Sequence, residues 1–150
     1  MKKLTSVLCA LSLLILASSF TPPKDDTVSA KIKSAFEKTF TSASDVSWKK
    51  SGGFYLAYFK IDNQSFSASY NENGDLLSAS RSITLSQLPL NVNFALQHKF
   101  EGYALDNAVT EINVDGLSNY YIKGENSKSL VTIKATSTGD ITVESRTKKS

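Results

Sequence analysis

The same amphipathic helical spacing occurs twice in the chain, and the second copy lies sixty positions after the first. In each copy, apolar residues fall at i, i+4, i+7, i+8 and i+12, which is one face of an α-helix. The two sets are Val28, Ile32, Ala35, Phe36 and Phe40, and Leu88, Val92, Ala95, Leu96 and Phe100. Because an amphipathic helix must cover another element with its apolar face, each copy needs a surface that the residues after it supply.

The residues around these two segments suit helix ends. Asp25, Asp26 or Thr27 can cap the first helix at its N-terminus. Pro89 suits the first turn of the second helix, and Gly102 fits its C-terminal end.

The residues after each helix repeat with a shift of sixty-five, so that "NENGDLLSASR" (71–81) returns as "TSTGDITVESR" (136–146). Apolar and polar residues alternate in both copies and predict two runs of strands. The strands are expected at about 45–50, 54–61, 64–70 and 76–83, and at about 108–114, 118–124, 129–135 and 141–146. Short connections such as "DNQ" and "ENSK" indicate antiparallel hairpins. The sequence therefore predicts an α+β fold of two tandem α–β units, each one helix followed by about four antiparallel strands.

The alternation also separates the two faces of the predicted sheet. Val131, Ile133 and Ala135 form the clearest apolar set, and this set should face a helix. The same register turns Tyr55, Ala57, Phe66, Ala68 and Tyr70 inward and turns a second set outward. The outward residues that we select as a candidate partner-binding surface are Leu56, Tyr58, Lys60, Tyr121, Lys123 and Lys134.

This outward set combines aromatic and basic side chains. Tyrosine is a favoured interface anchor because it offers a large apolar area with few rotatable bonds. The competing interpretation is a half-exposed sheet face on which apolar residues are scattered as on any protein surface. The sequence does not decide between them.

The N-terminus predicts export. Residues 1–19 have the form of a secretory signal peptide, with Lys2 and Lys3 before an apolar run and small residues up to Ser19, after which cleavage is expected. The alternative, an uncleaved anchor, requires a longer apolar run of about 20 residues. Residues 20–27 ("FTPPKDDT") predict a flexible leader, and residues 28–150 a single domain of two repeats, 28–84 and 85–146, with a short basic tail.

Cysteine usage and charge exclude several classes of partner. Cys9 is the only cysteine and lies inside the predicted signal, so the exported chain has neither disulfides nor thiolate metal ligands. The formal charge of +3 includes Lys2 and Lys3, whose removal leaves +1. Since nucleic-acid binding needs a basic patch, a nucleic-acid partner is not expected.

The chain lacks a recognisable catalytic or metal-binding constellation. His98, the only histidine, falls on the side of the second helix away from the apolar stripe. A general base requires a nucleophile within reach and a third group that orients it, and a metal site requires several grouped ligands. Gly52-Gly53 fits a hairpin turn and not a phosphate-binding loop. We therefore expect no catalytic residues, no metal, no cofactor and no enzyme activity.

The order and spacing of several short motifs resemble those of the PepSY-like, beta-lactamase-inhibitor-like (BLIP-like) periplasmic proteins. The motifs are "AFEKTF" (35–40), "VSW" (46–48), "FYLAYF" (54–59), "SYNENGDL" (69–76), "LPLNV" (88–92) and "TSTGDI" (136–141). The resemblance implies a curved antiparallel sheet with the helices on one face. In the inhibitor branch, the open face of the sheet grips a protein partner. The absence of cysteines after the signal departs from that branch, in which the characterised inhibitors use disulfides.

Two functional hypotheses follow. In the first, the protein is periplasmic or secreted and non-catalytic, and it docks an envelope or secreted protein on the open sheet face as an inhibitor or regulator of an envelope enzyme. In the second, it carries a small ligand or glycan in a pocket between the repeats. A membrane span is not expected to remain after signal cleavage.

Overall fold

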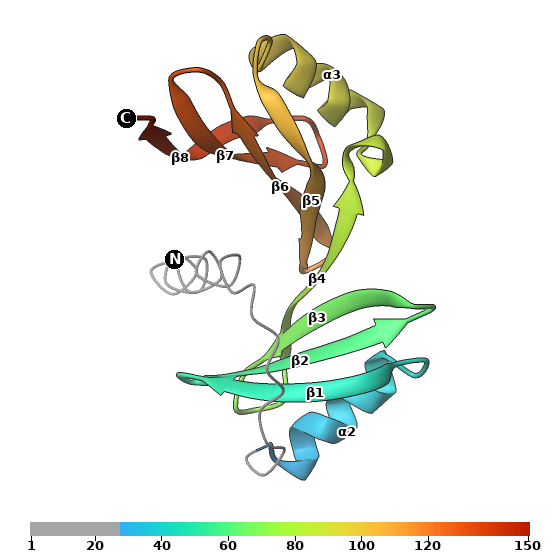
Figure 1. The fold of residues 1–150 in the computed structure, drawn as a ribbon. Helices are drawn as coiled ribbons and strands as arrows, with labels where there is room; N and C mark the ends of the chain where they lie inside the picture. The colour runs from blue at the N-terminus through green and yellow to red at the C-terminus, as the bar shows by residue number, and fades with distance from the viewer. Residues whose placement is uncertain (1–27) are drawn as a thin grey trace.

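The computed structural model describes residues 28–150, so the predicted signal peptide and leader lie outside the described residues. Two α-helices, one short 3₁₀ helix and eight strands make up this part of the chain (Figure 1). Their bounds are α2 Ala30–Thr39, β1 Ser44–Ser51, β2 Phe54–Ile61, β3 Gln64–Tyr70, β4 Leu76–Thr84, η2 Leu85–Gln87, α3 Leu90–Lys99, β5 Ala104–Val114, β6 Leu117–Glu125, β7 Ser129–Thr136 and β8 Ile141–Lys148.

The helices begin later than the sequence predicts. Ser29 caps α2, and its side chain accepts a hydrogen bond of 3.4 Å from the amide of Ile32. The predicted caps Asp25, Asp26 and Thr27 lie outside the described residues. Helix α3 has Pro89 at its N-cap without a side-chain cap bond, and the chain reaches it through η2, which the sequence analysis missed.

The prediction of two tandem α–β units is wrong. All eight strands form one antiparallel sheet in the order β1-β2-β3-β4-β5-β6-β7-β8. Strands β4 and β5 pair without a register shift from Ala79↔Asn113 to Thr84↔Ala108, so backbone hydrogen bonds continue across the predicted boundary. The sequence pattern could not show this, because side-chain alternation tells which face a residue takes and not which strand pairs with which.

Both helices pack on the same face of this sheet. Residues Phe59, Phe66, Arg81, Glu111, Tyr120 and Ala135 lie opposite one another in successive strands, so they share one face. Phe59 belongs to the apolar cluster around α2, and Tyr120 to the cluster around α3. Figure 1 shows the two helices near opposite ends of the sheet.

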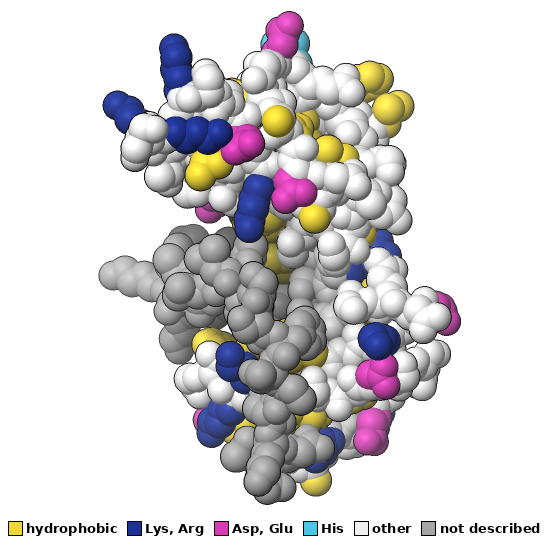
Figure 2. Space-filling view, in the orientation of Figure 1, with side chains coloured by type: hydrophobic (Ala, Val, Ile, Leu, Met, Phe, Trp, Pro, Cys, Tyr) yellow, Lys and Arg dark blue, Asp and Glu magenta, His cyan; other side chains and the backbone are white. Residues whose placement is uncertain are grey.

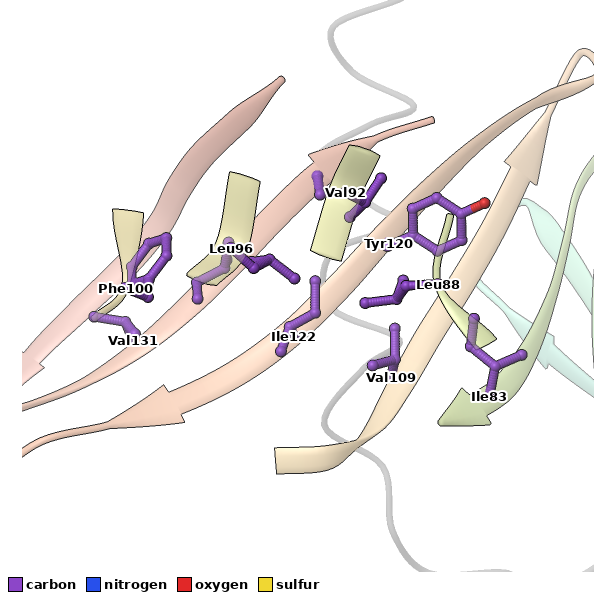
Figure 3. Close-up of a cluster of buried hydrophobic side chains, with 11 residues drawn as sticks. Ile83, Leu88, Val92, Leu96, Phe100, Val109, Tyr120, Ile122 and Val131 are labelled. Atoms are coloured by element: carbon purple, nitrogen blue, oxygen red, sulfur yellow. The ribbon is translucent and has the colours of Figure 1, made fainter. Parts of the chain in front are cut away.

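Each helix fills its own apolar cluster. Around α2, Phe36 packs edge-on against Phe59 and Trp48, with ring centroids 4.9 and 5.4 Å apart. Around α3, Val92 and Leu96 pack on Val109, Ile122 and other strand residues (Figure 3). The inward positions predicted from the alternation are confirmed as buried, or as packed against these clusters.

The two repeated glycine-aspartate turns rest against the starts of the helices. Gly74 has φ +81°, and a Cβ there would lie 3.6 Å from the carbonyl oxygen of Lys31. Gly139 has φ +93°, and a Cβ would lie 3.4 Å from the carbonyl oxygen of Asn91. The Asn91 side chain also donates a 3.0 Å hydrogen bond to the carbonyl of Ser137. The turns therefore join the β3–β4 and β7–β8 hairpins to the helices.

Tyr70 is a polar exception inside the α2 cluster. Its side chain is fully buried, and its hydroxyl makes no hydrogen bond among the described residues. The nearby Thr39 hydroxyl donates to the carbonyl of Ala35 at 3.0 Å. Burial raises the pKa of Tyr70 to about 12, and the Thr39 hydroxyl opposes this rise only in part.

Replacement of Tyr70 by phenylalanine should raise the free energy of unfolding by about 1 kcal/mol, because it removes a buried donor without a partner. Tyr103→Phe is the matched control, since the Tyr103 hydroxyl accepts a 2.6 Å hydrogen bond from Arg146 Nη1, and it should lower that free energy by about 1 kcal/mol. Urea denaturation measures both variants. A loss of stability in Tyr70→Phe equal to that in the control would contradict the account.

The buried phenol should also make stability fall in alkaline solution. The pKa of Tyr70 is near 10 in the unfolded chain and near 12 in the folded protein. Its contribution to the free energy of unfolding is therefore complete below pH 10 and is lost as the pH rises towards 12. The free energy of unfolding should fall by up to about 1.4 kcal/mol for each pH unit in this window. Tyr70→Phe lacks this phenol, so its free energy of unfolding should fall less steeply between pH 10 and pH 12 than that of the parent. Equal slopes in the parent and the variant would refute the assignment of the raised pKa to Tyr70.

Candidate functional site

The sheet face opposite α2 and α3, here called the open face, carries all six residues of the predicted surface. On β2 they are Leu56, Tyr58 and Lys60, which lie opposite Ser69, Ser67 and Ser65 of β3. The other three are Tyr121 and Lys123 of β6 and Lys134 of β7. Tyr121 lies directly opposite Lys134. None of the six belongs to either apolar cluster.

The three β2 residues differ in exposure. Leu56 is only 4% exposed, although it lies outside both clusters. Tyr58 is half-buried and Lys60 is exposed. Lys60 Nζ lies 2.9 Å from Asp45 Oδ2, and Asp45 has φ 52° beside the bulge that interrupts the β1–β2 register. The pairing of Lys60 depends on this bulge, which the sequence pattern did not predict.

Both tyrosines of the open face are partly shielded from water. Burial raises the pKa of Tyr58 and of Tyr121 above the usual value of 10.0. The carboxylate of Glu144 raises the pKa of Tyr121 further. Both phenols are therefore neutral at physiological pH, and each ring adds apolar area to the open face.

The structure does not bring the β2 group and the β6–β7 group together. Strands β3, β4 and β5 lie between β2 and β6, which corresponds to about 19 Å along the sheet at about 4.8 Å for each strand spacing. The predicted surface is therefore two separate patches.

A strip of serines on β3 and β4 separates the two patches. The hydroxyls of Ser67 and Ser80 lie 2.7 Å apart, as do those of Ser69 and Ser78. Next to them Ile112, opposite Ser80, is 6% exposed and lies outside both clusters. The sequence signal is serine at every second position of "SFSAS" and "SASRS". Because serine side chains are short, they project less far from the sheet than the side chains of Tyr58 and Tyr121.

Several hollows lie among the described residues. The hollow in the middle of the sheet has a volume of about 180 Å³ and is lined by residues including Arg81 and Glu111. A larger one of about 380 Å³ lies between α2 and β1, with Phe40 and Trp48 in its wall. Another of about 400 Å³ lies where Ala104 and Leu105 meet Lys123 and Leu130. Pockets for drug-sized molecules usually measure about 300–1,000 Å³.

The described residues can also be compared with the requirements of a metal site, a catalytic histidine and a membrane span. Within residues 28–150 no group of three or more histidine, cysteine, aspartate or glutamate side chains could hold a metal ion. His98 is exposed on α3. None of the helices in this part of the chain combines the length and apolar character that a bilayer crossing requires. Figure 2 shows acidic and basic side chains interspersed on the face in view.

No protein-family model matches the chain, and no curated protein matches it. Several solved structures, however, have a similar fold. A BLIP-like protein from Bacteroides fragilis superimposes with a TM-score of 0.71 at 17% identity, over 89% of this chain and 92% of that chain. A DUF2874 family protein from Bacteroides uniformis superimposes with a TM-score of 0.69 at 17% identity, over 81% and 89%.

A protein from Bacteroides eggerthii that is described as a candidate periplasmic protein is also similar, with a TM-score of 0.67 at 16% identity, over 86% of this chain and 90% of that chain. The resemblance to BLIP-like proteins is confirmed at the level of the fold, whereas the PepSY-like part of it is not. The chain thus shares its fold with BLIP-like and DUF2874 family proteins of Bacteroides.

Proposed function

We propose that this chain is a non-catalytic periplasmic or secreted protein that docks a protein partner on its open face. One observation carries the proposal: Tyr58 and Tyr121 lie on a sheet face on which no described helix packs, one on each side of the low serine strip. Hot spots of protein interfaces are rich in tyrosine, and they are surrounded by contacts that exclude water.

The shape of this face suits a protein better than a small molecule. Specific protein interfaces bury about 800 Å² on each partner, which requires contact over several strands. Two tyrosines about 19 Å apart can grip both sides of one protruding segment. The half-buried hydroxyls of Ser67 and Ser80 between them can exchange their mutual hydrogen bond for bonds to the backbone of that segment.

Similarity to known folds supports the same function. One neighbour is described as BLIP-like, and in the inhibitor branch of that family the open sheet face grips a protein. Inhibition or regulation of an envelope enzyme is therefore the form of docking that we propose. The chain itself has no disulfide within residues 28–150, because Cys9 is its only cysteine, so it relies on its two apolar clusters for rigidity.

The N-terminus and one neighbour support a periplasmic or secreted location. Residues 1–19 have the pattern of a secretory signal, and the neighbour from Bacteroides eggerthii is described as a candidate periplasmic protein. The partner is then an envelope or secreted protein.

A small-ligand carrier is the second candidate, and the hollow beside α2 favours it. Its volume of about 380 Å³ and the aromatic side chains of Phe36, Phe40 and Trp48 suit an apolar group. Glu37 in its lining can orient a polar end. This site is not the pocket between the repeats that the sequence suggested.

Truncation of both open-face tyrosines should abolish docking. In a pull-down from a bacterial envelope extract, the parent should capture a protein that mass spectrometry identifies, and the Tyr58→Ala/Tyr121→Ala variant should not. With the purified partner, each tyrosine should account for at least about a 30-fold loss of affinity, as expected for a hot spot.

The chain offers a matched control on α3. Leu90 and Phe94 are 69% and 61% exposed, and Leu90→Ala/Phe94→Ala removes exposed apolar area away from the open face. This variant should bind like the parent, and circular dichroism should show all three proteins folded. Equal capture by the tyrosine variant would refute docking on the open face, and the Phe40→Ala variant would then test the hollow beside α2.

A further inference from the structure

The two apolar clusters do not merge across the middle of the sheet. On the helix-bearing face, Phe66 of the first cluster and Tyr120 of the second are separated by only two residues in the same row, Arg81 and Glu111. Two apolar side chains at these positions would join the clusters into one core. The charged pair instead divides the packing beneath a continuous sheet.

This pair belongs to a small polar network. Arg81 Nε lies 2.6 Å from Glu111 Oε2, and Ser118 Oγ donates to Glu111 Oε1 at 2.9 Å. Asn113 Nδ2 donates to Ser118 Oγ at 3.3 Å. The side chain of Arg81 is 43% exposed and that of Glu111 is 15% exposed. The network thus connects β4, β5 and β6 at the point where neither helix covers the sheet.

The open face is also thinly packed at this point. Ser80 and Ser82 of β4 lie opposite Ile112 and Thr110 of β5, so three of the four side chains are short and polar. In Figure 1, β4 and β5 form the middle of the sheet, and the two helices lie on either side of them.

A bend at this place costs less than a bend under a helix. Bending under α2 or α3 would pull a helix off the sheet and expose apolar area at about 25 cal/mol for each Å². Between β4 and β5, a bend disturbs mainly polar side-chain contacts, together with one apolar pair, Ile83 and Val109, and the buried Ile112. The backbone hydrogen bonds can persist, because the twist between neighbouring strands ranges from about −10° to −35° in proteins.

We propose that the β4–β5 pair is a hinge of the sheet, and that the Arg81–Glu111 ion pair is the latch that sets its angle. The angle fixes how far apart the β2 patch and the β6–β7 patch of the open face stand. Use of the hinge to fit a partner rests on the proposed function. The hinge itself does not, since it can be measured on the protein alone.

The test measures the distance between two spin labels, one on each side of the hinge. Lys49→Cys in β1 and Thr142→Cys in β8 place them at exposed positions, in the full chain with Cys9→Ser. The parent should give one narrow distance distribution. Arg81→Gln and Glu111→Gln should each broaden it or shift its mean by about 5 Å, which corresponds to a twist change of about 15° acting over about 20 Å.

Two controls separate a latch from a general loss of structure. Arg81→Glu/Glu111→Arg reverses the pair and should restore the parent distribution. Asp45→Asn breaks the Lys60–Asp45 pair, which has the same type of contact but joins β1 to β2 on one side of the hinge, and it should leave the distribution unchanged. Parent-like distributions in both single variants would overturn the proposal.

High salt gives an independent readout should either single variant fail to fold. Because Arg81 is partly exposed, about 1 M NaCl weakens its attraction to Glu111 and should broaden the parent distribution. The Arg81→Gln/Glu111→Gln double variant should show no further response to salt. An unchanged parent distribution at 1 M NaCl would also overturn the latch.

Discussion

The backbone pairing of β4 with β5 is the interaction on which the rest of the structure depends. It is the link that makes one sheet of eight strands. The apolar clusters around α2 and α3 do not merge, and Ile83 of β4 packs in the α3 cluster opposite Val109 of β5. Without this pairing, the open face would not continue from Tyr58 to Tyr121.

Local features of this fold could be predicted from the sequence, because they depend on periodicity. The apolar spacing located both helices, and the alternation assigned Tyr55, Ala68 and Ile133 to the buried face. The single sheet could not be predicted, because pairing between strands leaves no mark in the pattern of either strand. The bulges could not be predicted for a related reason. The extra residue at Asp45 interrupts the alternation, but no distinctive residue type marks it in the sequence.

The sequence predicted which face of the sheet carries the candidate site, but not how far apart the residues of that site lie. Register alone placed Leu56, Tyr58 and Tyr121 on one face, and that placement agrees with the structure. Distances across strands need the strand order, so the gap between the patches was not foreseen. The role of Arg81 and Glu111 was equally hidden, because they lie thirty residues apart and meet only through the β4–β5 register.

The irregularities in the outer strands have a further consequence. The sheet does not close on itself, so β1 and β8 each present a free edge among the described strands. The register shifts at both, between Ser44 and Ser47 in β1 and opposite Thr132 and Ile133 in β8. Two basic residues lie in each strand, Lys49 and Lys50 in β1 and Arg146 and Lys148 in β8. Bulges and charged side chains prevent strands of other molecules from adding to an edge. Both edges of the sheet are therefore protected against edge-to-edge aggregation, so the protein can remain monomeric at high concentration without a cover over either edge.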